Sequence, residues 1–368
     1  MAGRGVRVWR QGNGAVSACL RLSVETWCRV GSGNPGAFTP MKIGFIGTGR
    51  ITDSHLSSMR RLDLPFPLEP LGFFSPRQQS RDAAVSRWGG RAFESVDSLI
   101  AARPDAVYVT SPTPFHAEQA CAVARAGIPL YLEKPAARTR SEFEVLRADV
   151  NAAGILNCLG VQWRYRPETD RLRDLFAANP PSLVVGQWYW FTPPVAWLRD
   201  RETGGGQVFD QLVHIIDVAG FLVGDATSVF ARFMQNPNAR YPDFRNWDSY
   251  TVSIGYQKAI GSFSSTYRLN VPMDDRVCLD FVCGDLFVRY QPSGIRVTGP
   301  EKTESYLDPG ERGLDMVGRD HIERAFLMAV HTDDRSLIRS SVDDIANTMN
   351  VVFAATESAE SGQPVEIA

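Results

Sequence analysis

A lysine beside a proline is the first feature of this sequence that could do chemistry. Glu133, Lys134 and Pro135 follow a short apolar run, which we expect to form a strand of a parallel sheet. Ligands bind at the carboxyl ends of such strands. Pro135 restricts the neighbouring backbone, so the ammonium group of Lys134 could be held firmly enough to exchange a proton with a hydroxyl group. The alternative is an exposed lysine near a turn.

A second candidate pair follows three consecutive glycines, residues 204–206. Asp210 and His214 are four residues apart in a run with helical periodicity. On a helix they share one face, so the carboxylate could orient the imidazole and raise its basicity. Asp217 continues that face, and we expect the glycines to allow close approach by a substrate or cofactor. The alternative is a histidine packed in the core.

A glycine-rich turn predicts a dinucleotide site near the start of the folded chain. An apolar run from Met41 breaks at Gly47 and becomes helical after Gly49. Gly47 permits a tight turn, and the missing side chain of Gly49 lets a pyrophosphate approach the N-terminus of the helix. Thr52 occupies the third glycine position of the usual pattern, and a plain structural turn is the alternative. The residues of the predicted turn site are Gly47, Thr48, Gly49, Arg50 and Ile51.

The elements around these residues alternate between strand and helix. Expected strands alternate with expected helices and are joined by short links, which favours a parallel, doubly wound sheet. We therefore predict an α/β fold with an N-terminal Rossmann domain over residues 41–160. The expected strands are 41–46, 68–74, 106–110 and 129–133, and the expected helices are 51–62, 78–88, 95–102 and 116–126.

The pattern changes near residue 161, where longer β-type runs follow one another. We predict a C-terminal α+β domain over residues 161–368 with a large, mostly antiparallel open sheet, whose apolar face a partner subunit could cover. A homodimer or homotetramer is expected, with the C-terminal helix packing back toward the first domain. The expected strands are 183–191, 228–233, 251–256, 261–267, 277–282 and 286–291, and the expected helices are 320–330 and 342–361.

Composition excludes several classes of protein. The chain has 368 residues, with 39 basic and 41 acidic residues and a formal net charge of −2, so no basic stripe suggests nucleic-acid binding. No uninterrupted apolar run approaches the roughly eighteen residues of a membrane span. Residues 1–40 are rich in Arg and Gly; we interpret them as an unfolded extension before Met41, with a transit-type presequence as the alternative.

The six cysteines show no metal-binding spacing. We interpret them as reduced thiols of a cytoplasmic protein and predict no metal. Cys278 and Cys283 could share a metal with His321 or His331, but small apolar packing is the preferred reading. The remaining cysteines are Cys19, Cys28, Cys121 and Cys158.

In several ordered motifs the chain resembles the Gfo/Idh/MocA family of NAD(P)-dependent oxidoreductases, from Met41 to the end. Two departures stand out. Thr113-Pro114 stands where the family often has Asn after Pro, and Arg164 begins a segment that matches only loosely. Arg164 could reach the substrate or brace the junction between the domains, and we interpret it as a brace. The matching motifs are the glycine turn with His55, residues 105–112 with His116, Ala126-Gly127 before Glu133-Lys134-Pro135, and Trp197 with the triple glycine, Asp210, His214 and Asp217.

The resemblance implies a role for each matching residue. Lys134 would be the catalytic lysine, His214 the partner acid or base, and Asp210 its orienting carboxylate. Glu133 would contact the nicotinamide ribose, and Pro135 would set the backbone of the lysine. The implied cofactor-lining loop contains Thr110, Ser111, Pro112 and His116.

The choice between NAD and NADP depends on the end of the second strand. An NAD enzyme usually places an acid there, whereas this chain offers Ser75 and Arg77. Arg77 could bind a 2′-phosphate by a charge-assisted hydrogen bond, so the prediction is NADP or NAD, with NADP favoured. The alternative is an arginine in solvent at a helix start.

The predicted function is transfer of a hydride between the nicotinamide and a carbon of a small sugar, cyclitol or related polyol, as the resemblance implies. Two alternatives stay open. Some relatives use bound NAD to oxidise a sugar transiently, eliminate its substituent and reduce the product. A non-catalytic ligand sensor on the same scaffold is disfavoured because Lys134, Asp210 and His214 are all present.

Overall fold

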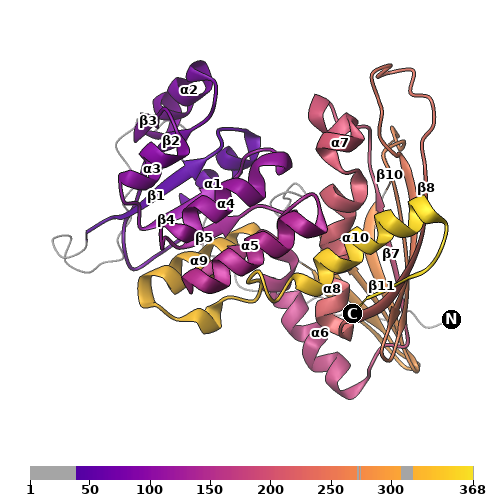
Figure 1. Cartoon of the computed structure of the whole chain (residues 1–368). Coiled ribbons are helices and arrows are strands. Elements are labelled where there is room, and N and C mark those ends of the chain that lie inside the picture. Colours follow the sequence, from indigo (N-terminus) through magenta and orange to yellow (C-terminus); the bar gives the residue numbers. More distant parts are fainter. Residues whose placement is uncertain (1–38, 272, 274, 308–317, 368) are drawn as a thin grey trace. The chain divides into compact units, whose positions relative to one another are not determined.

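The structure is a computed structural model that describes residues 39–271, 273, 275–307 and 318–367 (Figure 1). The described chain forms two compact units. The first unit contains residues 39–162 and 318–345, and the second contains residues 163–307 and 346–367. The predicted N-terminal extension, Cys19 and Cys28 lie outside the described residues, apart from positions 39 and 40.

The first unit is built on a parallel six-stranded sheet with the order β3-β2-β1-β4-β5-β6, as a Rossmann fold requires. This confirms the predicted fold class. Strand β4 is buried along its whole length, so it reads as a continuous apolar run. The strands are β1 (Met41–Ile46), β2 (Leu68–Phe74), β3 (Arg91–Phe93), β4 (Ala106–Val109), β5 (Leu130–Leu132) and β6 (Asn157–Leu159), and the helices are α1 (Arg50–Met59), α2 (Gln78–Trp88), α3 (Val96–Ala101), α4 (His116–Arg125), α5 (Arg140–Ala153) and α9 (Arg319–Thr332).

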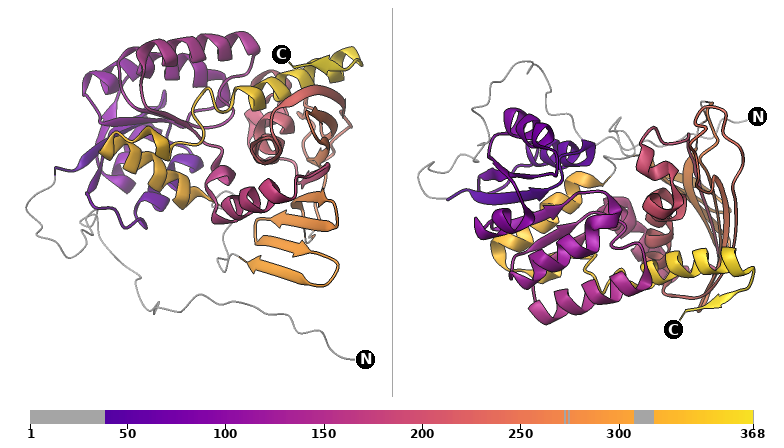
Figure 2. Two further views of the ribbon diagram at one scale, coloured as in Figure 1. Left: turned by 90° about the horizontal axis from the view of Figure 1, so that it is seen from below. Right: turned by 45° about the horizontal axis from the view of Figure 1, so that its top comes forward.

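The chain returns to the first unit through α9 and the segment after it (Figure 2). Phe326 of α9 packs edge-on against Tyr108 and Tyr131, with ring centroids 5.4 and 5.5 Å apart. The backbone N–H of Leu159 in β6 donates to the carbonyl of Ser340 at 2.7 Å, so this segment lies along the edge of the sheet. The sequence-based range 161–368 for the second domain did not include this return.

The second unit is a nine-stranded sheet with the order β14-β13-β12-β11-β7-β10-β9-β8-β15. Its pairs are antiparallel except for β7 with β10, which agrees with the predicted mostly antiparallel sheet. The strands are β7 (Leu183–Tyr189), β8 (Ala226–Met234), β9 (Ser249–Tyr256), β10 (Ile260–Thr266), β11 (Val277–Cys283), β12 (Leu286–Gln291), β13 (Gly294–Thr298), β14 (Thr303–Leu307) and β15 (Val365–Glu366), and the helices are α6 (Pro167–Ala178), α7 (Arg201–Gly204), α8 (Val213–Val223) and α10 (Ala346–Ser361).

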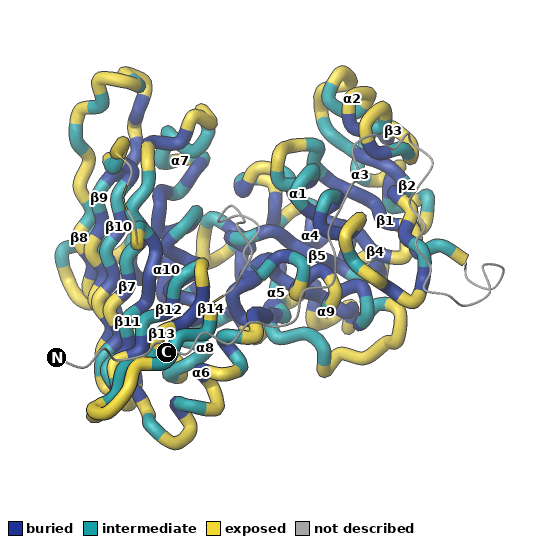
Figure 3. Tube along the Cα trace, turned by 180° about the vertical axis from the view of Figure 1, so that it is seen from behind, coloured by how far each residue is buried: buried dark blue, intermediate teal, exposed yellow. Residues whose placement is uncertain are grey.

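Alternating burial along the strands divides this sheet into two different faces (Figure 3). Val184 and Trp188 of β7 are buried on the face that α8 covers, and α10 packs against β8. On the other face, Val185 is 42% exposed and Phe287 is 40% exposed. That face also carries the Asp280–Arg289 ion pair, so it is mixed in polarity rather than apolar as the sequence suggested.

The stretch Arg201–Val223 is long and apolar enough to cross a membrane by length and composition alone. Within the second unit, however, two thirds of its most apolar window is buried, at 67%. Seven consecutive residues of α8, from Val213 to Ala219, are buried. The core packing of α8 accounts for this apolar composition.

Candidate active site

The glycine turn joins β1 to α1, and its two glycines differ in their surroundings. Gly47 has φ +125°, and a Cβ atom there would lie 2.7 Å from the backbone carbonyl carbon of Thr110. At Gly49 no described atom lies within 4 Å of an added Cβ. Gly49 is the N-cap residue of α1 and, as a glycine, supplies no side-chain cap. The turn therefore leads into a helix N-terminus whose N-cap residue leaves room for an anionic group.

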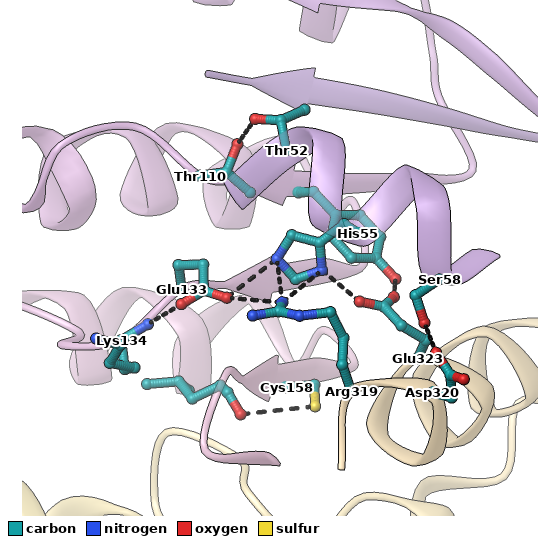
Figure 4. Close-up of polar contacts among 12 residues, drawn as sticks. Thr52, His55, Ser58, Thr110, Glu133, Lys134, Cys158, Arg319, Asp320 and Glu323 are labelled. Atoms are coloured by element: carbon teal, nitrogen blue, oxygen red, sulfur yellow. Dashed lines mark hydrogen bonds and ion pairs between the residues drawn. The ribbon is translucent and has the colours of Figure 1, made fainter. Parts of the chain in front are cut away.

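Thr52 replaces the third glycine of the usual pattern without disturbing the turn. Its side chain is buried, and its hydroxyl oxygen lies 2.8 Å from that of Thr110 at the end of β4 (Figure 4). The two threonines thus join the start of α1 to the neighbouring strand. The other predicted turn residues, Thr48, Arg50 and Ile51, are exposed or half-buried along the same turn.

The loop after β4 is held mainly by its own hydrogen bonds. Ser111 donates its hydroxyl to Gln119 at 2.6 Å. The ring nitrogens of His116 each lie 2.7 Å from a backbone carbonyl oxygen, Nε2 from that of Ser111 and Nδ1 from that of Pro135. Burial lowers the pKa of His116, and a neutral ring has one N–H to donate. His116 therefore links the loop that contains the exposed Pro112 to the turn after Lys134.

Lys134 lies just beyond the carboxyl end of β5, at the same edge of the parallel sheet as the glycine turn. Its side chain is half-buried, and its peptide bond to Pro135 is cis. Its backbone N–H donates to Oε2 of Glu133 at 3.2 Å. The structure thus brings Lys134 and the glycine turn into one unit.

Glu133 belongs to a buried charged network that the sequence analysis did not predict (Figure 4). Its Oε1 atom lies 3.0 Å from Nε2 of His55 and 3.2 Å from a guanidinium nitrogen of Arg319. The other ring nitrogen of His55 contacts Glu323. Tyr108 donates its hydroxyl to Glu323 at 2.7 Å. His55 and Glu133 lie in motifs that the sequence analysis identified. Arg319 and Glu323 come from α9, where no residue spacing pointed to them.

The network sets the ionisation of its members. Burial alone would raise the pKa of Glu133, but the hydrogen bond from His55 and the charge of Arg319 outweigh burial and hold that pKa well below its usual value. Burial alone would lower the pKa of His55, yet the Glu323 charge and the carboxylate hydrogen bonds raise it. Glu133 is therefore an ionised carboxylate at neutral pH, next to Lys134.

The end of β2 carries the residues predicted to select the cofactor. Ser75 is half-buried, and Arg77 is exposed at the N-cap position of α2. Arg81, in the first turn of α2, donates to the backbone carbonyl of Ser75 at 2.7 Å and so fixes the loop. Residues 74–77 contain no acid that would repel a phosphate.

Asp210 and His214 belong to the second unit, and the helix around them is not regular. Asp210 lies in a π-helical turn, η4 (Val208–Leu212), which continues directly into α8 with His214. The π-helical turn changes the side-chain spacing that the sequence argument assumed. Tyr267 donates its hydroxyl to Oδ2 of Asp210 at 2.9 Å. The ring of His214, 7% exposed, stacks on the ring of Trp188 at 5.7 Å.

The three glycines before η4 are required by the protein's own packing. A Cβ atom on Gly204 would lie 2.8 Å from the Cα atom of Leu198, and one on Gly206 would lie 2.8 Å from the Tyr250 hydroxyl. Gly206 also has φ +93°. Neighbouring backbone and side chains occupy the positions that Cβ atoms would take on Gly204 and Gly206, so these glycines have a packing role; their close approach to a ligand stays a prediction.

Asp217, which the sequence placed on the candidate catalytic face, forms a structural ion pair. Arg164 donates two hydrogen bonds to its carboxylate, at 2.9 and 2.7 Å. Thr348 of α10 donates a third at 2.9 Å, and Asp217 is fully buried. Arg164 therefore braces α8 within the second unit, whereas the sequence-based interpretation placed this brace at the junction between the domains.

The cysteines that the structure describes lie in the interior of the protein. Cys121, Cys158, Cys278 and Cys283 are buried free thiols. Burial raises the pKa of Cys278 and of Cys283 to about 11, so both are protonated at neutral pH. Among the described residues, no group of three or more His, Cys, Asp or Glu side chains could hold a metal ion.

The sheet order and the glycine turn define the class of protein: a dinucleotide-binding Rossmann unit joined to a second unit with a large open sheet. Residues 41–156 match the family model described as "Oxidoreductase family, NAD-binding Rossmann fold", and residues 180–282 match the "GFO/IDH/MocA C-terminal domain". The chain belongs to the Gfo/Idh/MocA family of oxidoreductases.

Relatives with known names agree with this membership. A glucose-6-phosphate 3-dehydrogenase of Bacillus subtilis is 24% identical over 62% of this chain, but the match spans only 66% of that relative, just under two thirds. A D-glucoside 3-dehydrogenase of Escherichia coli is 25% identical over 89% of this chain and 98% of its own length. A solved levoglucosan dehydrogenase in complex with NADH and levoglucosan shares the fold, with a TM-score of 0.79, 18% identity and coverage of 89% of this chain and 100% of that chain.

Proposed function

We propose that the protein is an NAD(P)-dependent oxidoreductase acting on a secondary alcohol of a sugar, cyclitol or related polyol. The observation that carries the proposal is the position of Lys134 beyond β5, at the same sheet edge as the open glycine turn. The names of the two curated relatives, which are sugar 3-dehydrogenases, support the substrate class.

The residues around the turn fit a dinucleotide. Gly47 and Gly49 would let the pyrophosphate approach α1, and Thr48, Arg50 and Ile51 would line it. When bound, the nicotinamide would supply the hydride acceptor or donor. Lys134 would move a proton at its Nζ atom to or from the substrate hydroxyl, with His214 as a second proton-transfer group and Asp210 as its positioning carboxylate.

We further propose a preference for NADP. Arg77 is exposed at the start of α2, and Ser75 is fixed by Arg81. A guanidinium group there could bind a 2′-phosphate, whereas an NAD enzyme would usually place an acid at this position.

Fluorescence titration with NADPH and NADH tests the cofactor proposal. We expect NADPH to bind more tightly, and Arg77→Ala to weaken NADPH by about tenfold or more while leaving NADH nearly unchanged. Arg103→Ala, which removes an exposed-loop arginine far from β2 in sequence, is the control. Equal binding of both nucleotides by the wild type would overturn the NADP preference. No binding of either would overturn the oxidoreductase proposal.

The physiological reaction then follows from an NADP(H)-coupled screen of sugars, inososes and polyols. Steady consumption of the nucleotide supports a dehydrogenase or reductase. Turnover of a glycoside without net change in the nucleotide would instead identify the NAD-assisted lyase reaction.

A further inference from the structure

Four charged side chains meet in the interior of the first unit. His55 comes from α1, Glu133 follows β5, and Arg319 and Glu323 come from α9. The side chains of His55 and Glu323 are fully buried, and those of Arg319 and Glu133 are only 3% and 6% exposed. With His55 protonated, this group, which we call the buried quartet, has two positive and two negative charges.

We infer that His55, Arg319 and Glu323 are positioning residues that hold the Glu133 carboxylate ionised and in one orientation for the nicotinamide half of the cofactor. The inference rests on the proposed function, because it assumes that the cofactor binds at this edge of the sheet. It assigns a functional task to α9, which lies outside both matched family ranges.

The hydrogen bonds leave the Glu133 carboxylate little freedom to turn. Oε1 faces His55 and Arg319, and Oε2 accepts from the backbone N–H of Lys134. A Cβ atom on Gly160 would lie 3.1 Å from the carboxylate, so the backbone closes the space behind it. Any turn of this carboxylate would therefore break contacts with three groups, including the residue proposed to move the proton.

When protonated, His55 supplies a positive charge between the carboxylates of Glu133 and Glu323. It lies between Glu133 and Glu323, and a guanidinium nitrogen of Arg319 is 3.0 Å from its Nε2 atom. Tyr108 and Tyr131 face the ring edge-on, with centroids 5.3 and 5.0 Å away. Two further titratable groups lie close by. The charge of Lys134 helps to lower the pKa of Glu133, and Cys158 of β6 lies near both tyrosines.

A purely structural link between α1 and α9 would not need buried charges. Burying ions costs more free energy than packing apolar side chains of similar volume. The same two helices are already joined nearby, where Asp320 accepts hydrogen bonds from Ser58 and Arg61. Asp320 is not a member of the buried quartet, so this second link between the helices provides a control.

The test measures cofactor affinity against pH in the full-length protein. In His55→Gln, the amide can still donate a hydrogen bond to Glu133 but carries no charge, so the positive charge beside Glu133 comes only from Arg319 and Lys134, and the pKa of Glu133 rises. We expect the affinity for NADH and NADPH, relative to wild type, to fall about tenfold or more as the pH is lowered from about 8 to about 5.5. Asp320→Asn should keep the wild-type ratio throughout.

A second pair of variants guards against a loss of folding. Arg319→Met removes the other cation and should show the same loss at low pH, whereas Arg319→Lys keeps the charge and should restore the wild-type profile. Melting temperatures recorded at each pH separate binding from stability.

Two outcomes would overturn the inference while leaving the proposed function intact. One is a wild-type profile in both His55→Gln and Arg319→Met. The other is a loss of affinity that is equal at every pH and follows the melting temperature, which would indicate a merely structural role. Failure of the wild type to bind either nucleotide would instead overturn the proposed function.

Discussion

Glu133 and Lys134 are adjacent in the sequence, yet their environments differ sharply. The carboxylate is buried and hydrogen-bonded on both oxygens, while the lysine side chain is half-buried. A fixed negative charge therefore lies directly beside the residue that we propose to move the proton.

Replacement of Lys134 tests its proposed role directly. Lys134→Ala should lower kcat by about 10²- to 10⁴-fold with the substrate found by the screen, because a positioned proton donor contributes about this much. Nucleotide affinity should change little. Lys258→Ala, at an exposed turn, is the control. Unchanged kcat in Lys134→Ala would show that another group moves the proton.

Sequence reasoning identified only part of the site at this scale. His55 and Glu133 stood in motifs, but their partners did not: Glu323 is 268 residues from His55, and Arg319 is 186 residues from Glu133. Local spacing carries no information about such contacts. The roles of Lys134, Asp210 and His214 stay predictions.

Elements with a clear local pattern were predicted well. Strand β2 and helix α2 have the predicted bounds, since Pro76 follows the strand and Gly89 is the C-cap residue of the helix. Helix α5 was not predicted, although Thr139 and Glu142 form a capping box at its start. The three-residue strands β3 and β6 are too short to show any period.

The triple glycine illustrates the limit of reasoning by residue type. Glycines before a candidate helix fit a ligand site and a crowded backbone equally well, and the distances to Leu198 and Tyr250 favour crowding. The π-helical turn η4 could not be predicted either, because its hydrogen bonds between residues five apart leave no mark on the composition of the segment.

A substitution at Gly206 measures that crowding. Gly206→Ala should destabilise the protein by about 1–3 kcal/mol, because it combines a strained positive φ with a contact to Tyr250. Gly284→Ala is the matched control, since its φ is +59° but no described atom lies within 4 Å of the added Cβ. Thermal or denaturant unfolding of both variants compares them. An equal cost at the two sites would show that backbone strain alone, and not contact, requires Gly206.

At the scale of the whole molecule, the open face of the large sheet is the surface that we expect a partner subunit to cover. It carries exposed Val185, Phe230 and Phe287 together with the Asp280–Arg289 pair. An antiparallel sheet can expose one face to water, but exposed apolar side chains that lie together can mark a protein interface. We therefore keep the homodimer or homotetramer as a prediction, along with the cytoplasmic location.

Light scattering after size exclusion tests the assembly. We expect the wild type to have the mass of two or four chains, and Val185→Asp with Phe287→Asp to shift the mass toward one chain. Val145→Asp, on an exposed helix surface of the first unit, should leave the mass unchanged. A wild type that elutes with the mass of one chain would contradict the prediction.

The return of α9 has a consequence for how the protein is made. Translation runs from the N-terminus, so β1 to β6 leave the ribosome long before residues 318–345 exist. Until then, Tyr108 and Tyr131 lack Phe326, and His55 and Glu133 lack both α9 partners. During that time the nascent Rossmann sheet has an uncovered apolar and charged surface, while strands β7 to β14 of the second sheet are synthesised. A chain cut after residue 162 would lack α9 and leave that surface exposed, so the first unit is complete only when residues 318–345 are present.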